Sequence, residues 1–378
     1  MRPDYEGGSL VNLVASVVAS RGGEPLHETL RNFSLRADAT NAVLFIIDGL
    51  GDNVVARHGS GSELGRRRRR ALTSVFPSTT ASAITTSYTG RTPLEHGLTG
   101  WFTYFGEAGC VSALLPFKSR GDMVSLSARG MTADRLFTSP SLFGALPMKS
   151  IVVTHRDIIN SEYNSVHCRG AEKLAYVNAE ELVAQVERAV KSSDERKFIY
   201  AYWPVYDQTC HRYGCESTQA AREFETIDAS FGSLLRRVAG TDTVVIATAD
   251  HGFIDVAPEE SLELPPALIP ALRFPLCGER RVVYCHVHAP DDFAKRAQDW
   301  LQDKADVMPS HQLVEEGWFG PGTPHPSFAE RIGDVAFVMR DHYTVKDWIT
   351  GESRHLHIGN HGGTHEDEML IPLIVEEA

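Results

Sequence analysis

Three long apolar runs, each followed by polar residues, most constrain how this chain folds. They are NAVLFIIDGLG (41–51), KFIYAYWPV (197–205) and DTVVIATADHG (242–252). Apolar runs without alternation are typical of strands that are buried on both faces. Helical spacing of apolar residues follows at 179–193 and 217–240, and the second helix is expected to end at Gly240. Strands that alternate with helices predict an α/β fold with a doubly wound, mostly parallel sheet and helices on both faces.

The domain organisation is predicted to be simple. At 378 residues the chain can form one large α/β domain or two smaller ones, and no repeat or low-complexity linker divides it. The segment 253–356 is rich in proline, whereas GNHGGTHEDEMLIPLIVEEA at the C-terminus indicates a loop and a last core strand. We therefore expect a single catalytic domain over 1–378, with 253–356 as a smaller inserted cap segment.

Composition excludes several classes of partner. The formal net charge of −12 argues against a nucleic acid polymer or an anionic membrane as the main partner. No apolar run is long enough to span a bilayer, and the N-terminus is a poor signal peptide. Six cysteines without a CxxC pair indicate a cytoplasmic protein with reduced thiols. The basic run Arg66–Arg70 favours a solvated face over a phosphate-binding patch. The sequence leaves open a monomer or a homodimer.

Polar side chains gather where the predicted strands end. Alone, each has an ordinary explanation, such as a turn cap or an exposed loop pair. Together, three carboxylates and three imidazoles at one edge of a sheet can hold two divalent cations. Zinc suits this oxygen and nitrogen set best, and manganese or iron also fits. The candidates are Asp48, Asp207, His211, Asp250, His251 and His361.

A run of hydroxyl residues, VFPSTTASAITTSYTG (75–90), raises the question of a nucleophile. Ser78, Thr79 and Thr80 follow a proline and precede a segment that reads as the start of a helix. A metal ion can activate such a hydroxyl by stabilising the alkoxide, and a helix N-terminus favours negative charge beside it. The other reading is that Ser78 or Thr79 only caps the helix.

These motifs together resemble the alkaline phosphatase superfamily, and within it the type I phosphodiesterase or nucleotide pyrophosphatase branch. The matching pieces occur in the order of that family across nearly the whole chain. They are DG at Asp48, FPSTTAS (76–82), TGRTPLEHGL (89–98), DQTCHRYG (207–214), ADHG (249–252) and HGG (361–363).

The resemblance implies an alkaline-phosphatase-like fold and a role for each site residue. Asp207, His211 and His361 would hold one metal, and the other would be held by Asp48, Asp250, His251 and the nucleophile Thr80. Thr79 is the alternative nucleophile, and His365 is a weaker candidate for the last ligand.

The implied function is a two-metal phosphodiesterase or nucleotide pyrophosphatase that acts on a small phosphate ester through a phospho-threonine intermediate. The alternatives are a phosphomonoesterase, a phosphonate hydrolase, a phosphomutase or sulfatase relative, and an inactive metal-binding protein. One departure concerns the substrate. The family that this sequence resembles carries an asparagine three residues after the nucleophile, whose amide helps to bind a phosphoryl oxygen, whereas this position is Ala83 here. A backbone amide, Thr103, Tyr104 or an arginine of the insertion would have to replace it.

Overall fold

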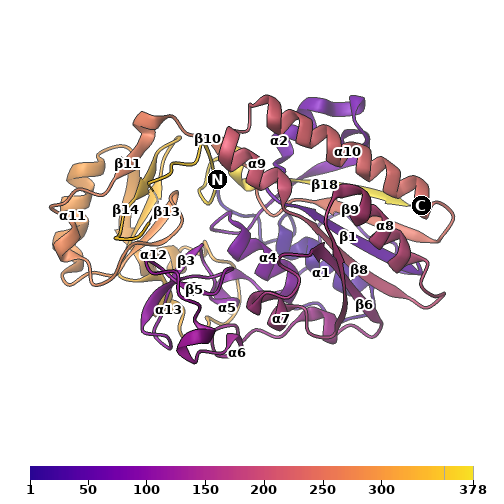
Figure 1. The fold of residues 1–378 in the computed structure, drawn as a ribbon, viewed down its shortest axis with the longest axis horizontal. Helices are drawn as coiled ribbons and strands as arrows, with labels where there is room; N and C mark the ends of the chain where they lie inside the picture. Colours follow the sequence, from indigo (N-terminus) through magenta and orange to yellow (C-terminus); the bar gives the residue numbers. More distant parts are fainter. Residues whose placement is uncertain (353, 378) are drawn as a thin grey trace.

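The larger of two lobes is built on a seven-stranded sheet (Figure 1). The computed structural model describes residues 1–352 and 354–377. In spatial order the strands of this sheet are β2 (Arg68–Thr73), β18 (Leu370–Glu377), β9 (Thr243–Thr248), β1 (Asn41–Ile47), β8 (Lys197–Trp203), β6 (Lys149–His155) and β7 (Ala171–Tyr176). All neighbouring strands are parallel except that β18 runs antiparallel to both β9 and β2. The three apolar runs thus form the adjacent central strands β9, β1 and β8, and the predicted last strand is β18.

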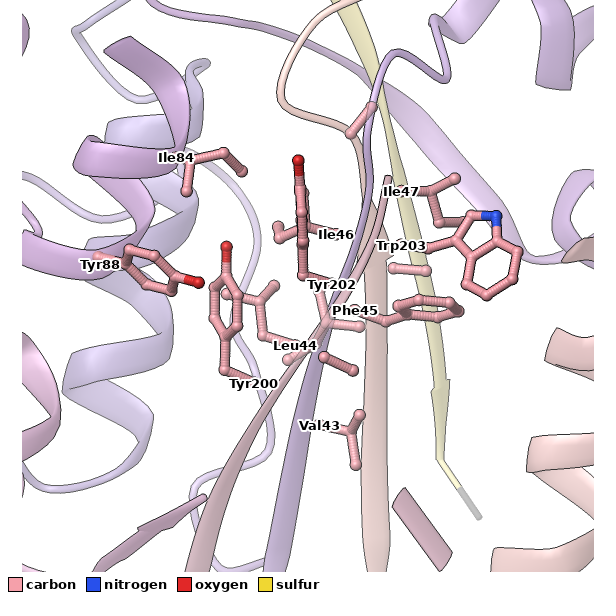
Figure 2. Packing of buried hydrophobic residues seen from close by; sticks show 14 of the residues in the cluster. Val43, Leu44, Phe45, Ile46, Ile47, Ile84, Tyr88, Tyr200, Tyr202 and Trp203 are labelled. Atoms are coloured by element: carbon pink, nitrogen blue, oxygen red, sulfur yellow. The ribbon is translucent and has the colours of Figure 1, made fainter. Parts of the chain in front are cut away.

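Side chains on opposite faces of this sheet contact different helices. In Figure 2, Tyr200 and Tyr202 of β8 point to the side on which Ile84 and Tyr88 lie, and Trp203 points to the other side. On the first side lie α1 (Leu10–Ser20), α4 (Thr80–Thr89) and α7 (Glu162–His167).

The second face is covered by α8 (Ala179–Val190) and α10 (Thr218–Val238), where the indole of Trp203 donates to Glu223 at 2.8 Å. The side chain of Ser217 caps α10 by accepting from the amide of Ala220 at 3.1 Å. Both predicted helices are present, although α10 ends two residues before Gly240. Helices on both faces of a mostly parallel sheet confirm the predicted fold class.

The smaller lobe is a second sheet, in which all neighbouring strands are antiparallel. In spatial order its strands are β14 (Ala305–Pro309), β15 (Val335–Met339), β13 (Val282–Cys285), β12 (Cys277–Gly278), β3 (Phe102–Phe105), β4 (Cys110–Ala113) and β5 (Lys118–Ser119). Helix α11 (Pro290–Leu301) packs on it, and this lobe has its own apolar clusters. The lobe therefore combines part of the expected 253–356 cap with residues 102–119, which no sequence pattern connects to that cap.

Besides the two large sheets, the described residues form two short two-stranded sheets. They pair β10 (Ile254–Asp255) with β17 (Gly359–Asn360), and β11 (Ser261–Glu263) with β16 (Thr344–Lys346). The shorter helices are α2 (Asp52–His58), α3 (Glu63–Arg67), α5 (Pro93–His96), α6 (Ala133–Leu136), α9 (Val205–Tyr213), α12 (Ser310–Glu315), α13 (Phe328–Ile332) and α14 (Glu366–Met369). Within residues 1–352 and 354–377, no helix has the length and apolar character needed to cross a membrane.

The basic run lies at the end of α3 and the start of β2. Arg67 pairs with Glu63 at 2.7 Å and with Glu376 at 3.1 Å, and Arg68 pairs with Asp52 at 2.6 Å. The run therefore forms ion pairs at the edge strand, and it is not simply a solvated face.

Candidate active site

The six predicted ligand residues converge at the carboxyl ends of the central strands. Asp48 follows β1, Asp207 and His211 lie on α9 after β8, and Asp250 and His251 follow β9. His361 comes directly after β17. Loops at this edge of a parallel sheet are where α/β proteins place their sites. The side chains form two groups, within each of which the potential ligand atoms lie within 4.8 Å of one another: Asp207, His211 and His361, and Asp48, Asp250 and His251.

The first group depends on one helical turn. Because Asp207 and His211 are four residues apart on α9, they share a face, with 3.4 Å between Oδ1 and Nε2. The Nε2 atom of His361 lies 3.7 Å from Asp207 Oδ1 and 3.2 Å from His211 Nε2. His211 also places Nδ1 at 2.9 Å from the carbonyl of Gly359. With Nδ1 as the donor, its Nε2 lone pair faces the group, which is the usual arrangement of a metal-binding histidine.

The second group is held by backbone amides. Oδ1 of Asp250 accepts from the amides of Gly49 and His251, each at 3.0 Å. His251 places Nε2 at 3.5 Å from Asp250 Oδ2 and at 3.4 Å from Asp48 Oδ1, while its Nδ1 lies 3.0 Å from the carbonyl of Gly252. The hydroxyl of Tyr202 donates to the other oxygen of Asp48. Each carboxylate therefore directs one oxygen toward His251.

Glycine is required where the chain turns between the two groups. Gly49 has φ +76°, and a Cβ there would lie 2.5 Å from Phe253 Cε2 and 3.3 Å from the Cα of Asp207. The close approach lets the Gly49 amide reach Asp250. The DG motif is thus explained by space and backbone conformation together.

Electrostatics and unsatisfied atoms both indicate that this site fits cations. Burial raises the pKa of Asp207 to about 7 and that of Asp250 to about 8, and neighbouring carboxylates add to both shifts. Burial lowers the pKa of His211 to about 4. Among the described residues, the carboxylate oxygens Asp207 Oδ1 and Asp250 Oδ2 are buried without a hydrogen-bond partner. Leaving such an atom unpaired costs about 1–3 kcal/mol. A bound cation would satisfy these unpaired oxygens. Carboxylate oxygens and imidazole nitrogens are also the ligands that divalent metals such as zinc prefer.

Of the three hydroxyl residues, only Thr80 faces the second group. Its Oγ1 lies 3.1 Å from His251 Nε2 and 3.4 Å from Asp48 Oδ1. Thr80 is the first residue of α4, so its amide lies at the helix N-terminus, which favours negative charge nearby.

The neighbouring hydroxyls have other partners. Ser78 donates to the carbonyl of Gly363 at 2.8 Å, and Thr79 donates to Glu279 at 2.7 Å. Thr79 is therefore the N-cap residue by position, but the expected capping hydrogen bond to a hydroxyl oxygen of Ser78 or Thr79 is not formed.

A cavity of about 1060 Å³ opens beside Thr80 between the two lobes. Trp101, Phe102 and Leu115 give it an apolar wall, whereas Arg280 and Lys346 supply positive charge. Its lining includes residues of both sheets, so neither lobe alone encloses the site.

The predicted substitutes for the missing amide do not all reach this cavity. Ala83 is fully buried in the core of the larger lobe and does not itself line the cavity. Thr103 bonds to the carbonyl of Gly100, and Tyr104 stacks on Phe274 at 4.1 Å between ring centroids; neither lines the cavity. Arg280 does line it, as an arginine from the insertion. His365 lies outside both ligand groups.

Sequence reasoning missed two residues of this site. Tyr202 stands inside an apolar run and carries no separate signal, although a polar hydroxyl one residue before the end of a buried strand is a hint. Glu279 lies in CGERRVV, about 200 residues from its partner Thr79, and no local pattern connects them.

Comparison with known proteins shows which family the chain is similar to. The family model "Type I phosphodiesterase / nucleotide pyrophosphatase" matches residues 42–364. No curated protein shows significant sequence similarity to the chain.

Similar solved structures include murine ectonucleotide pyrophosphatase / phosphodiesterase 5, with a TM-score of 0.67 and 15% identity over 88% of this chain and 87% of that one. An inactive form of the murine protein was solved in complex with AMP, and it has a TM-score of 0.66 and 15% identity over the same shares of the chains. Phosphonoacetate hydrolase from Sinorhizobium meliloti 1021, in complex with phosphonoformate, has a TM-score of 0.65 and 15% identity over 89% of this chain and 90% of that one. At this level of identity the likeness concerns the fold.

Proposed function

Because the chain belongs to the type I phosphodiesterase / nucleotide pyrophosphatase family, we propose that it is a phosphoric ester hydrolase that depends on two divalent cations and uses Thr80 as its nucleophile. One observation carries the proposal. The Oγ1 of Thr80, alone among the three adjacent hydroxyls, lies against an Asp/His group, at 3.1 Å from His251 Nε2. A hydroxyl beside a metal site at a helix N-terminus is placed for nucleophilic attack.

The two residue groups would hold the two metals. Asp207, His211 and His361 would bind one cation, and Asp48, Asp250 and His251 the other, together with Thr80. Zinc is the proposed metal, because the set mixes imidazole nitrogen with carboxylate oxygen. When bound, such ions lower the free energy of the threonine alkoxide and of the leaving oxygen.

The protein's own residues orient the reaction. Oγ1 of Thr80 would lose its proton to solvent and form a bond to phosphorus while the bond to the leaving alcohol or phosphate breaks. The leaving oxygen takes up a proton from water, and a phospho-threonine remains. Water would then cleave that ester and restore the hydroxyl. The free amides at the start of α4 would stabilise charge on the phosphoryl oxygens. Tyr202 would hold Asp48 in orientation through its hydrogen bond.

Cavity size favours a diester over a small monoester. A volume of about 1060 Å³ is at the upper end of ordinary ligand pockets. A phosphoryl group alone would leave most of this space to water, whereas a substituted leaving group would fill more of it. We also propose a cytoplasmic location, since none of the cysteine spacings forms a CxxC pair.

The experiment combines metal analysis with a substrate panel. Metal per chain is measured, and the apoprotein is reconstituted with zinc or manganese. Turnover is then followed for bis-p-nitrophenyl phosphate, p-nitrophenyl phosphate and p-nitrophenyl sulfate. We expect metal-dependent diester turnover that falls by at least about a thousandfold in Thr80→Ala, in line with the loss of a covalent nucleophile.

Thr226→Ala is the matched control, because Thr226 lies exposed on α10. Sulfate ester as the best substrate, or normal turnover in Thr80→Ala, would overturn the proposal. A full metal complement with no turnover of any ester would indicate a binding protein instead.

A further inference from the structure

Glu279, in the turn between β12 and β13, lies between the start of α4 and the loop that carries a predicted metal ligand. Its Oε1 accepts from the hydroxyl of Thr79 at 2.7 Å. On the other side it packs against Gly362, where an added Cβ would lie 2.8 Å from both Cβ and Cγ of Glu279. Thr79 directly precedes Thr80, and Gly362 directly follows His361. The side chain of Glu279 therefore contacts the immediate neighbours of the nucleophile and of a ligand.

One carboxylate oxygen of Glu279 has no protein donor. Oε1 takes both hydrogen bonds of the side chain, the second of them from the amide of Trp101 at 2.7 Å. Oε2 takes none from the described residues. Glu279 is half-buried and lines the cavity that contains Thr80. Oε2 is therefore open to the cavity, close to the place where a phosphoryl group would meet Thr80.

Glu279 also lacks a cationic partner, in contrast to two other acidic residues near it. Asp347, which lines the same cavity, pairs with Arg120 at 2.7 Å. The fully buried Glu368 pairs with Arg281 at 2.8 Å. In the part of the chain that the structure describes, no Arg, Lys or His nitrogen lies within 4.0 Å of an oxygen of Glu279. No side chain in contact with it therefore neutralises its charge.

The surroundings of this carboxyl group determine when it is charged. Burial raises the pKa of Glu279 to about 7, and its two hydrogen bonds oppose this shift. The positive charges of His251 and Arg280 oppose it as well. Cations at the two ligand groups would act in the same direction, because a nearby positive charge favours the ionised form of a carboxyl group. Above neutral pH a negative charge therefore stands beside the nucleophile.

We propose that Glu279 is a specificity-determining residue, which repels a phosphoryl group with two negative charges from Thr80 and accepts one with a single charge. The inference rests on the proposed function, because it takes Thr80 as the position of the phosphoryl group. A phosphodiester or a phosphonate monoester is a monoanion, whereas a phosphate monoester is largely a dianion above neutral pH. A fixed negative charge in a partly desolvated cavity raises the free energy of the bound dianion more than that of the monoanion.

The test measures the binding of two anions that differ by one charge and carry no leaving group. Methylphosphonate is a dianion, and dimethylphosphinate has a methyl group in place of one oxygen and is a monoanion. Calorimetry on the zinc-loaded protein compares them at about pH 9, where carboxyl groups are ionised. Glu279→Gln keeps an oxygen that can accept from Thr79 and Trp101 but removes the charge. We expect this variant to bind methylphosphonate at least about tenfold more tightly than the unaltered protein does, and dimethylphosphinate with less than about a threefold change.

Two control variants separate the charge of Glu279 from its structural contacts. Thr79→Val removes the hydrogen bond but keeps the carboxylate, so the ratio of the two affinities should stay within about threefold of that of the unaltered protein. Glu225→Gln removes an acidic charge at an exposed position on α10 and should also keep this ratio. In turnover, kcat/KM for p-nitrophenyl phosphate relative to bis-p-nitrophenyl phosphate should rise at least about tenfold in Glu279→Gln alone.

The outcomes for Glu279 and for the proposed hydrolysis are distinguishable. An unchanged ratio of the two affinities in Glu279→Gln, an equal shift for both anions, or binding of neither anion would overturn the role of Glu279. An equal change of the ratio in Thr79→Val would overturn it too, because the effect would then follow the hydrogen bond and not the charge. If the ratio changes as expected in Glu279→Gln but no ester is turned over, the role of Glu279 in anion selection stands and the proposed hydrolysis fails.

Discussion

The hydroxyl of Thr79 donates a hydrogen bond to Glu279 across the boundary between the two lobes, with 2.7 Å between Oγ1 and Oε1. Thr79 therefore has a structural partner, whereas the next hydroxyl, on Thr80, lies 3.1 Å from His251 Nε2. Two adjacent threonines thus have separate surroundings, and their roles can be separated by mutation.

Thr79→Val should lower turnover without removing the covalent step. Burial raises the pKa of Glu279 to about 7, and a buried carboxyl that loses a hydrogen-bond donor costs about 1–3 kcal/mol, so a decrease of roughly 5-fold to 150-fold is expected if Glu279 is left without this donor. Phosphorylation of Thr80 should still be detected by mass spectrometry after rapid quenching. Thr79→Ser, which keeps a donor, should recover most of the activity. Phosphate found on Thr79 in the unaltered protein would contradict this assignment.

Asp250→Asn should weaken zinc binding but should not lower the stability of the metal-free protein. In the metal-free protein three carboxylates share a buried site, and Asp250 has Asp48 beside it. Asp250→Asn removes one negative charge and can keep the acceptor for the Gly49 amide. We therefore expect the metal-free variant to be at least as stable as the metal-free parent protein.

Zinc should then stabilise the variant less than the parent protein, because Asp250→Asn removes a ligand from one group and leaves the group of Asp207, His211 and His361 intact. A ligand at 100 times its dissociation constant adds about 2.7 kcal/mol to the free energy of unfolding. Thermal melts with and without zinc measure this difference. Asp299→Asn, at an exposed position on α11, should respond to zinc as the parent does. A zinc-dependent rise of equal size in Asp250→Asn would show that Asp250 is not a ligand.

The ligand set was predictable because its members follow strands that the sequence marks clearly. A parallel sheet brings the carboxyl ends of β1, β8 and β9 together whatever the loops do, so Asp48, Asp207 and Asp250 had to lie near one another. The i, i+4 spacing on α9 likewise predicts that Asp207 and His211 lie on one face of the helix, close to each other.

The second lobe was less predictable, because its contacts join distant segments. Strand β3 pairs with β12 through Phe102 and Gly278, and no periodicity at either place points to the other. Glu279 could not be predicted as part of the site for the same reason, because its partner Thr79 is far away in the sequence. Thr103 and Tyr104 were wrongly expected near the substrate, since sequence proximity to HGLTG says nothing about which side of a strand faces the cavity.

Gly49→Ala should damage both stability and metal binding. The backbone there has φ +76°, which costs an alanine about 1–2 kcal/mol, and its Cβ would also lie 2.5 Å from Phe253 Cε2. A shift of this turn would move the amide that holds Asp250. Chemical denaturation and zinc titration should therefore both report a loss.

Gly240→Ala separates the two causes. Gly240 has φ +74°, close to that of Gly49, but no heavy atom lies within 4 Å of its added Cβ. The free energy of unfolding of Gly240→Ala should fall only by the cost of the positive φ for alanine, about 1–2 kcal/mol, and its zinc affinity should be that of the parent protein. Equal effects of the two substitutions on zinc affinity would rule out the close approach at Gly49 as the reason for the glycine.

Glu368→Ala should be among the most destabilising single changes. Its carboxylate is fully buried, pairs with Arg281 at 2.8 Å and accepts from the amide of Gly363. Removing one partner of a buried pair leaves the other charge uncompensated, at a cost of about 3–5 kcal/mol. Urea unfolding measures the change, and weaker zinc binding is expected because the loop of His361 loses its anchor.

An exposed ion pair provides the comparison for Glu368. Arg340 and Asp306 form one whose side chains are 52% and 44% exposed, so Asp306→Ala should cost no more than about 1 kcal/mol. Similar losses in the two variants would mean that burial of the Arg281–Glu368 pair has no energetic consequence.

His167 on α7 should make the protein less stable in mild acid. Its ring is buried beside Tyr163, with Nδ1 at 3.0 Å from a backbone carbonyl and Nε2 without a partner among the described residues. Burial lowers its pKa to about 4, whereas an unfolded histidine titrates near 6.5. Between these values the unfolded chain binds more protons, so the free energy of unfolding falls as the pH decreases from 6.5 toward 4.

The contribution of this one ring can be isolated with a substitution. At pH 5 the linkage amounts to about 2 kcal/mol relative to pH 8. His167→Phe, which fills the same aromatic surroundings but cannot titrate, should lose this part of the pH dependence in urea unfolding at saturating zinc. His311→Phe, at an exposed position, should keep it. If the slopes of His167→Phe and the parent protein coincide between pH 5 and pH 8, the ring takes up a proton in the folded protein as readily as in the unfolded chain. That result would be incompatible with its burial against Tyr88 and Phe137.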